Sequence, residues 1–379
     1  MKITDILLII LNFAGGLAVF LFAMKLMSEG LQKVAGQRMR ALLGKLTGNR
    51  LSGILTGAGV TATIQSSSAT TVMVVSFVNA GMLSLNGAVA VIMGANIGTT
   101  MTAWIISLLG LGEGGGQFSL ALLLAALSLP FTFSKKERLQ AVGQPVMGLA
   151  LLLVGMDLLK GAMPNLEEYP ALLRAIASLS GHGFGSVLIF TAIGALMTCI
   201  VQASAATMAI TLLMCQNGWI GFEMAVALVM GENIGTTITA NLAATVTNDA
   251  GKKAARAHLM FNVMGVVLTL LAFRPLTGLV AHMAEGMTGS SPYVAAGSIP
   301  VAISLFHTMF NVANTLIQVW FIRQIVWAVD RMVQSGRGSL GARLKDALRS
   351  AGEGCSRGLL WLYGMHHNMG SNGGNCGPI

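Results

Sequence analysis

The chain has 379 residues, of which 54% are hydrophobic and only 10% carry a charge. Soluble domains carry about 25% charged residues, so this composition excludes an ordinary soluble protein and predicts an all-α polytopic membrane protein surrounded by lipids. The net charge of +9 does not indicate a nucleic-acid partner, because the lysines and arginines lie in short loops between apolar runs, where membrane topology explains them.

Apolar runs recur along the chain, and a helix of about 20 residues crosses a hydrocarbon core of roughly 30 Å. The first run, residues 3–27, is too long for the apolar part of a secretory signal and lacks a small-residue cleavage site, so we expect it to be retained. A basic amphipathic stretch, residues 28–50, is expected to lie in the membrane interface on the cytoplasmic side. Further spans are predicted at residues 85–111, 118–133, 146–159, 222–244, 258–280 and 298–326.

Two segments hold more hydroxyl groups than a membrane-buried segment normally tolerates. The first, TATIQSSSATT at residues 61–71, lies in a polar core over residues 51–81. The second, TCIVQASAATM at residues 198–208, lies in a polar core over residues 186–217. Glycines interrupt the first core before its hydroxyl cluster, which favours a helix that enters the membrane, turns and returns. We therefore predict a re-entrant helical hairpin of the QSSS type in each core.

The two cores belong to an internal repeat. Residues 57–103 align with residues 194–240 at one constant offset and without a gap, and 20 of the 47 positions are identical. The identities include polar residues and the run NIGTT at residues 96–100 and 233–237, so a chance likeness between two apolar segments does not explain them. Secondary transporters are commonly built from inverted repeats with discontinuous helices, which hold substrate and coupling ions where the copies meet.

The predicted spans give the two repeats opposite orientations. Three crossings separate the two hairpins, and an odd number turns the second copy upside down. With the N-terminus outside and the C-terminus in the cytoplasm, 19 of the 23 lysines and arginines fall on the cytoplasmic side of the membrane, as the positive-inside rule requires. We predict a transporter domain at residues 1–328, with repeats at about 3–160 and 161–328, and a basic, partly disordered cytoplasmic tail at 329–379.

The polar cores suit a small anion together with a hard cation. Hydroxyls, amides, backbone N–H groups and helix N-termini bind oxyanions, whereas carbonyl, amide and hydroxyl oxygens bind sodium. Neither core contains a lysine or an arginine. Because holding an anion in a low dielectric without a cationic side chain is costly, the missing positive charge is expected to arrive with the substrate. This is the physical argument for cation symport.

The duplicated motif resembles that of a known family. QSSS and QASA, each followed by a GxNIGTT segment, and HLMFN at residues 258–262 are similar to the type II sodium/phosphate cotransporters, including their bacterial members. The resemblance covers nearly all of the membrane portion. It implies sodium-coupled movement of inorganic phosphate, with Na⁺ as the coupling ion, no other cofactor and no enzymatic activity.

The resemblance also implies which residues hold each ligand. The phosphate-binding candidates are amides and hydroxyls of the two hairpin motifs: Gln65, Ser66, Ser67, Ser68, Gln202, Ser204 and Thr207. The sodium-binding candidates lie in the hairpins and the NIGTT segments: Thr61, Asn96, Thr99, Thr100, Thr198, Asn233, Thr236 and Thr237.

The sequence departs from the family pattern in two places. Ala203 and Ala205 replace two of the three serines in the second motif, so hydroxyl ligands are expected mainly from the first hairpin. Many bacterial relatives carry a soluble PhoU-like domain after the membrane part, whereas a short basic tail follows here. Regulation through that domain is expected to be absent or supplied by a separate PhoU-like chain, and a homodimer is compatible with the sequence.

For several other polar or reactive residues, a structural role is weighed against a functional one. Glu232 stands where the first copy has Ala95, and as an intramembrane acid it is added to the sodium-binding candidates, with capping of hairpin backbone as the alternative. His258 and His307 each begin an HxxFN pattern whose His and Asn share a helical face, for which helix packing outranks proton coupling. The four cysteines lack metal-ligand spacing, so sodium is the only metal expected and no transition metal is.

Other functions fit the sequence less well. An intramembrane serine hydrolase needs an activated nucleophile, but no GxSxG surrounds Ser67 and no histidine lies in either repeat core. An ion channel normally gathers several identical subunits around one pore, whereas this chain carries its own repeat. A sodium symporter of sulfate or a dicarboxylate is the nearest alternative. We expect alternating access, in which sodium binds first and the hairpins then move against a scaffold that includes residues 3–27 and 146–159.

Overall fold

The structure is a computed structural model of the chain, and it describes residues 3–45, 49–109, 116–164 and 169–337. The chain divides into two units, residues 1–326 and residues 327–379. In the second unit only residues 327–337 are described, where the guanidinium of Arg331 lies 3.8 Å from the ring centre of Trp327. The predicted tail therefore lies mostly outside the described residues.

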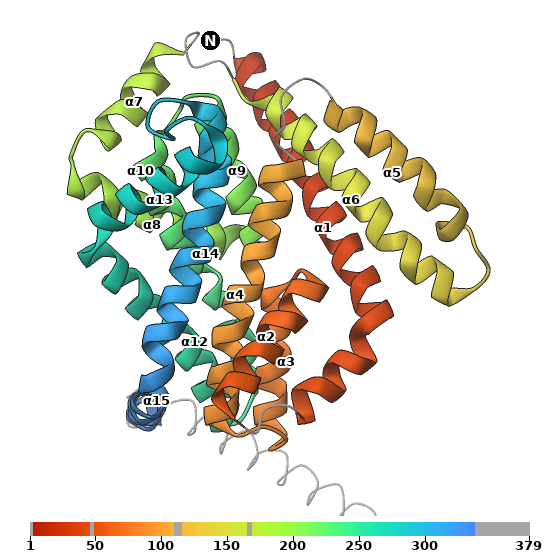
Figure 1. Cartoon of the computed structure of the whole chain (residues 1–379), viewed down its shortest axis with the longest axis vertical. Helices are drawn as coiled ribbons and strands as arrows, with labels where there is room; N and C mark the ends of the chain where they lie inside the picture. The colour runs from red at the N-terminus through yellow and green to blue at the C-terminus, as the bar shows by residue number, and fades with distance from the viewer. Residues whose placement is uncertain (1–2, 46–48, 110–115, 165–168, 338–379) are drawn as a thin grey trace, which may run out of the picture. The chain divides into compact units, whose positions relative to one another are not determined.

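Every secondary-structure element in the described residues is helical (Figure 1). In chain order the elements are α1 (Ile3–Lys45), α2 (Arg50–Ile64), α3 (Ser67–Asn79), α4 (Leu85–Leu109), α5 (Gly116–Thr132), α6 (Glu137–Ala162), α7 (Pro170–Ser180), α8 (Phe184–Val201), α9 (Ser204–Gln216), α10 (Phe222–Gly235), α11 (Thr237–Ala243), the short η2 (Ala244–Val246), α12 (Asp249–Leu271), α13 (Phe273–Thr288), η3 (Ala296–Ser298), α14 (Ile299–Gln318), η4 (Val319–Phe321) and α15 (Ile322–Arg337).

Six helical stretches are long and apolar enough to cross a membrane. They are Leu7–Ala35, Leu85–Leu109, Glu137–Ala162, Phe184–Val201, Asp249–Leu271 and Ala296–Val333. Shorter apolar helices, among them α3 and α9, accompany these spans. The chain is thus an integral membrane protein of the all-α class, as its composition predicts.

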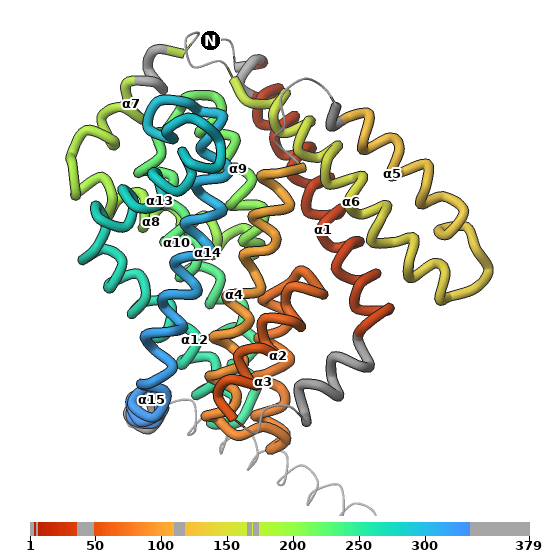
Figure 2. The backbone as a smooth tube through the Cα atoms, viewed as in Figure 1, coloured from red at the N-terminus to blue at the C-terminus, as the bar shows by residue number. Residues whose placement is uncertain are grey.

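α1 is one continuous helix of 43 residues, so the first helix does not end at residue 27 but runs on through most of the stretch predicted to lie in the interface. The helix continues because it keeps packing against α6 beyond that point. A Cβ on Gly30 would lie 2.4 Å from the ring of Pro145 in α6, and Ser28 is buried. Figure 2 shows α6 lying between α1 and α5. The side chains of residues 36–48 lie outside the described part of the chain.

Three other predicted spans have different limits in the structure. The span predicted at residues 222–244 is divided into α10 and α11 at Thr236, and the span predicted at 258–280 is divided into α12 and α13 at Ala272. The span predicted to begin after Pro145 instead begins at the start of α6, and the helix passes through the proline. Neighbouring helices make such an interior proline tolerable in a membrane, because they compensate for the missing backbone hydrogen bond.

Each predicted hairpin core consists of two helices joined by a two-residue turn, α2 to α3 and α8 to α9. The first turn residue is a glutamine with left-handed backbone conformation in both copies, with φ of 54° at Gln65 and 55° at Gln202. In the described chain these are the only non-glycine residues with positive φ. The interruption therefore has the same backbone geometry in both copies.

The hairpin helices also pack against the following helices through equivalent glycines. A Cβ on Gly57 of α2 would lie 2.0 Å from the carbonyl oxygen of Val91 in α4, and one on Gly194 of α8 would lie 2.1 Å from that of Leu228 in α10. Both members of each pair occupy aligned positions of the repeat, so the sequence repeat is also a repeat of helix contacts. In Figure 1, α2 and α3 lie in the lower half, and α8 and α9 in the upper half.

We expect Gly57→Ala and Gly194→Ala to destabilise the protein, because the added methyl group meets rigid backbone rather than a side chain that can move. Overpacking of this kind costs about 1–3 kcal/mol or more. Gly59→Ala on α2 is the matched control, since nothing lies within 4 Å of its added Cβ and the gain in helix propensity is about 1 kcal/mol. Thermal unfolding in detergent should show a lower Tm for the first two variants only; equal Tm values for all three would contradict the close crossings.

Candidate functional site

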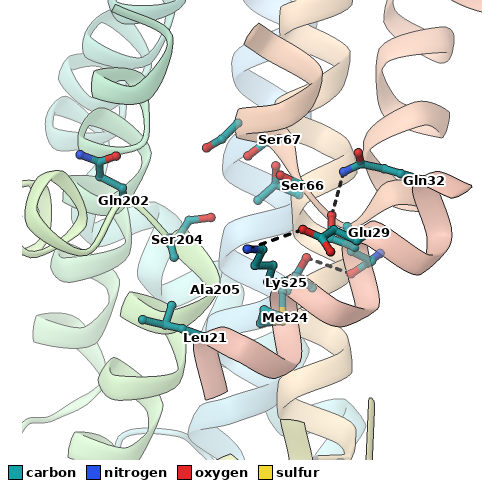
Figure 3. A pocket seen from close by; sticks show the side chains of 16 residues that line it. Leu21, Met24, Lys25, Glu29, Gln32, Ser66, Ser67, Gln202, Ser204 and Ala205 are labelled. Carbon is teal, nitrogen blue, oxygen red and sulfur yellow. Dashed lines mark hydrogen bonds and ion pairs between the residues drawn. The ribbon is translucent and has the colours of Figure 1, made fainter. Parts of the chain in front are cut away.

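A cavity of about 370 Å³ lies where the two hairpin turns meet α1 and α4 (Figure 3). Its lining combines six residues of α1, four around the first turn, two of α4 and four around the second turn. Six of the seven predicted phosphate-binding residues are in this lining: Gln65, Ser66, Ser67, Ser68, Gln202 and Ser204. The structure therefore brings both motifs, which lie far apart in the sequence, to one cavity.

The first turn is held by side chains from three helices. Ser66 caps α3, its Oγ accepting a hydrogen bond from the N–H of Ala69 at 3.2 Å. Gln65 Oε1 accepts a hydrogen bond from Thr102 Oγ1 of α4 at 3.0 Å. From α1, the buried Ser28 Oγ donates to the carbonyl of Ile64 at 2.8 Å, which satisfies a carbonyl at the end of α2.

A pair of threonine hydroxyls joins the two helices of each hairpin. Thr61 Oγ1 donates to Thr70 Oγ1 at 2.9 Å in the first copy, and Thr198 Oγ1 lies 3.1 Å from Thr207 Oγ1 in the second. All four threonines are buried. Thr207, predicted to bind phosphate, is outside the cavity lining, because its side chain faces the partner helix of its own hairpin.

The second turn is less firmly tied than the first. Ala203 provides no side-chain cap for α9, so the N-terminal N–H groups of that helix have no competing hydroxyl. Gln202 is exposed. Thr239, which the repeat aligns with Thr102, has a buried Oγ1 without a hydrogen-bond partner among the described residues. The glutamine–threonine hydrogen bond of the first copy therefore has no counterpart in the second.

The helix ends at the turns determine the local electrostatics. The N-termini of α3 and α9 both lie at the cavity, and a helix N-terminus carries partial positive charge and free N–H donors. The C-termini of α2 and α8 lie beside the same turns, and their carbonyls suit a cation. The arrangement can hold an oxyanion and a small cation close together.

Most of the predicted sodium-binding residues are buried outside the cavity lining. Thr99 alone among them lines the cavity; the others, all buried, are Thr61, Asn96, Thr100, Thr198, Glu232, Asn233, Thr236 and Thr237. The two NIGTT segments differ in backbone, since α4 runs through its copy unbroken, whereas α10 ends and α11 begins within the second. The asparagine side chain of each segment donates a hydrogen bond to the backbone carbonyl four residues earlier. The donor–acceptor distance is 2.9 Å for Asn96 and 2.8 Å for Asn233.

Glu232 lies in α10 with only 2% of its surface exposed, and its Oε2 has no hydrogen-bond partner among the described residues. His258 and His307 are also buried. The asparagine one turn after each histidine donates to that histidine's backbone carbonyl rather than to its ring, at 3.0 and 2.9 Å. In the part of the chain that the structure describes, no three His, Cys, Asp or Glu side chains are grouped to hold a metal ion.

Sequence reasoning missed the contribution of α1 to the cavity. Lys25 and Glu29 of α1 both line it, with 3.8 Å between Lys25 Nζ and Glu29 Oε1, and Gln32 Nε2 donates to Ser28 Oγ at 3.2 Å. The inference that the repeat cores lack a cationic side chain is correct, but the fold supplies one from outside them. Two opposite charges one turn apart in an apolar span are the signal that indicates a polar cavity.

A polar cavity where two interrupted helices meet inside a bundle of apolar helices is typical of membrane transport proteins. The chain belongs to the Na⁺/Pi-cotransporter family, whose sequence profile matches residues 19–161 and 171–289. This match contains α1 from Val19 onward, both hairpins and both NIGTT segments.

Three relatives illustrate the range of the family. The Salmonella typhimurium protein named putative inorganic phosphate export protein YjbB is 26% identical over 331 residues, covering 86% of this chain and 56% of that protein. Bacillus subtilis YqeW, described as uncharacterized, is 29% identical over 315 residues, which are 82% of this chain and 94% of YqeW. Human sodium-dependent phosphate transport protein 2B is 36% identical over 101 residues, 26% of this chain and 15% of the human protein.

The chain thus spans about half the length of YjbB and nearly the whole of YqeW. No solved structure matches the chain significantly.

The left-handed turn gives a prediction that depends on backbone alone. Gln65→Val places a β-branched residue at φ 54°, which costs about 1–3 kcal/mol, whereas Gln65→Gly adopts this conformation without strain. Both variants lose the hydrogen bond to Thr102, so the difference between them isolates the strain. We expect a lower Tm in detergent for the valine variant than for the glycine variant, and the reverse order would contradict the left-handed turn.

Proposed function

We propose that the protein is a sodium-coupled symporter of inorganic phosphate in the bacterial inner membrane. The observation that carries this proposal is that the N-termini of α3 and α9, with the polar side chains of both motifs, open onto one cavity. Phosphate is expected there, ligated by the amides and hydroxyls of Gln65, Ser66, Ser67, Ser68, Gln202 and Ser204 and by backbone N–H groups, with Thr207 supporting the second turn from behind.

Sodium is proposed to bind at the carbonyl ends of α2 and α8 and at the oxygen-rich residues of the NIGTT segments, with Glu232 as a negatively charged ligand. The unpartnered Oε2 of Glu232 supports this role, because a buried carboxylate oxygen normally has a partner. The buried threonine pairs and asparagines would position these oxygens. Sodium binding first would add positive charge beside the anion site.

We further propose that the domain at residues 1–328 consists of two inverted repeats with re-entrant hairpins, with the N-terminus outside and the C-terminus in the cytoplasm. The equivalent turns and glycine crossings support a structural duplication. The placement of α2 and α3 opposite α8 and α9 along the long axis supports the inversion (Figure 1), as does the distribution of lysines and arginines.

Alternating access would follow from the difference between the two turns. The first turn is closed by the Thr102–Gln65 hydrogen bond, whereas Thr239 and Gln202 do not form the equivalent one. If the second turn formed this hydrogen bond while the first turn lost it, the cavity would open to the opposite side of the membrane. The net direction would be set by the combined gradients, so the export named for YjbB and the sodium dependence named for human protein 2B are both compatible with one site.

We expect purified protein in liposomes to take up radiolabelled phosphate saturably when an inward sodium gradient is imposed. Ser67→Ala and Gln65→Ala should lower uptake strongly, because each removes a polar group at the cavity. Ser76→Ala is the matched control, since this exposed serine lies on the same α3 and bonds only within its helix. Normal uptake by both cavity variants would contradict the site.

The same assay separates the alternative functions. Sulfate or succinate competing better than phosphate would assign another anion, and a large sodium current without phosphate would assign a channel.

Glu232→Gln is expected to raise the sodium concentration for half-maximal uptake several-fold, because the amide keeps the shape but removes the charge that attracts the cation. The phosphate concentration for half-maximal uptake at saturating sodium should change little. Glu223→Gln is the control on the same α10, where the carboxylate lies in the first turn and accepts from Tyr293 at 3.5 Å. An unchanged sodium dependence in Glu232→Gln would assign this carboxylate a structural role.

A further inference from the structure

Lys25 and Glu29 lie in the interior of the span Leu7–Ala35, whose mean hydropathy is 2.4. Charged side chains in such a span are costly and normally face a water-filled cavity or each other. Here they do both, since they line the cavity and lie 3.8 Å apart (Figure 3). Their side chains are 71% and 50% exposed, respectively, so neither is enclosed by other parts of the protein.

Lys25 is the one cationic side chain in the described lining of this cavity, and Glu29 is the one anionic side chain. Figure 3 shows the lysine extending into the space between Ser204 of the second turn and Ser66 of the first. It therefore lies where an anion bound to both turns would be. The cavity thus contains a cationic side chain that neither repeat core supplies.

The ion pair leaves Lys25 able to change partners. At 3.8 Å the ammonium and the carboxylate are too far apart for a hydrogen bond, and ion pairs between exposed side chains contribute little to stability. An oxyanion in the cavity offers several acceptors, which the three N–H groups of an ammonium can bind directly. Replacing the Glu29 carboxylate by a bound oxyanion as the partner of the Lys25 ammonium therefore costs little free energy.

We propose that Lys25 is a direct ligand of the transported oxyanion and that Glu29 is its counter-ion in the empty cavity. This inference rests on the proposed function and adds to it a ligand from α1. The positive charge for the anion then comes partly from the protein and not from sodium alone. Glu29 keeps the empty cavity neutral and competes with weakly bound anions.

The test measures the KM for phosphate in sodium-driven proteoliposome uptake. Lys25→Gln is expected to raise the KM at least about tenfold, because a charge-assisted hydrogen bond is lost, whereas Lys25→Arg should stay much closer to the wild type. Glu29→Gln should lower the KM, because the competing carboxylate is gone. Lys33→Gln is the matched control: Lys33 lies on the same helix, outside the lining, and bonds Gln144 of α6 at 3.0 Å.

A charge-swapped variant, Lys25→Glu with Glu29→Lys, distinguishes ligation from mere pairing. It keeps an ion pair on α1 but moves the positive charge one turn away. A KM as high as that of Lys25→Gln supports the proposal. Recovery of the wild-type KM by the swap, or equal KM values for Lys25→Gln and Lys33→Gln, overturns it.

The controls keep the test decisive. Size-exclusion profiles in detergent establish which variants fold; if Lys25→Gln does not, the swap and Lys25→Arg still decide the question. If Lys25 variants match the wild type while Ser67→Ala is impaired, the proposed function stands and the lysine assignment fails. If the wild type itself shows no saturable phosphate uptake, the proposed function fails and the inference fails with it.

Discussion

A helix interrupted inside a membrane leaves backbone N–H and C=O groups that lipid cannot satisfy, and this structure depends on how those groups are accommodated. At the first interruption, Ser28 of α1 bonds the carbonyl of Ile64, and Ser66 bonds the N–H of Ala69. At Gly57 and Gly194, the absence of a side chain lets α2 and α8 pack against the backbone of α4 and α10, respectively. The N-termini of α3 and α9 lie at the cavity, where water or a ligand can reach their N–H groups. The same arrangement that makes the break tolerable therefore also forms the polar lining of the candidate site.

The electrostatic character of the cavity comes from two sources. The starts of α3 and α9 contribute partial positive charge from two copies of one motif, and α1 contributes a full charge at Lys25 together with its neutralising partner Glu29. α1 thus has a wider role than the scaffold expected from its apolar sequence, because it also satisfies the end of α2 through Ser28. A movement of the first hairpin relative to α1 would change both the backbone bonding of the turn and the position of the lysine.

The sequence predicted the duplicated elements well, and for a physical reason. Identical glycines at aligned positions of the repeat impose identical helix crossings, and identical glutamines take the same left-handed turn. The sequence was less successful where long-range packing decides. It ended the first span at residue 27, although Gly30 fits closely against Pro145 and the helix continues. It placed Thr207 among the phosphate-binding candidates, and in the structure this hydroxyl lies 3.1 Å from Thr198 Oγ1 within its own hairpin.

The sequence by itself determined that this is a helical membrane protein of the Na⁺/Pi-cotransporter type, because hydropathy and a repeated polar motif are local properties of the chain. It also identified most of the polar residues that line the cavity. Only the tertiary structure decided that the two turns meet at one cavity and that Lys25 and Glu29 line that cavity from α1. These facts depend on contacts between segments far apart in the sequence, which neither hydropathy nor an internal repeat records.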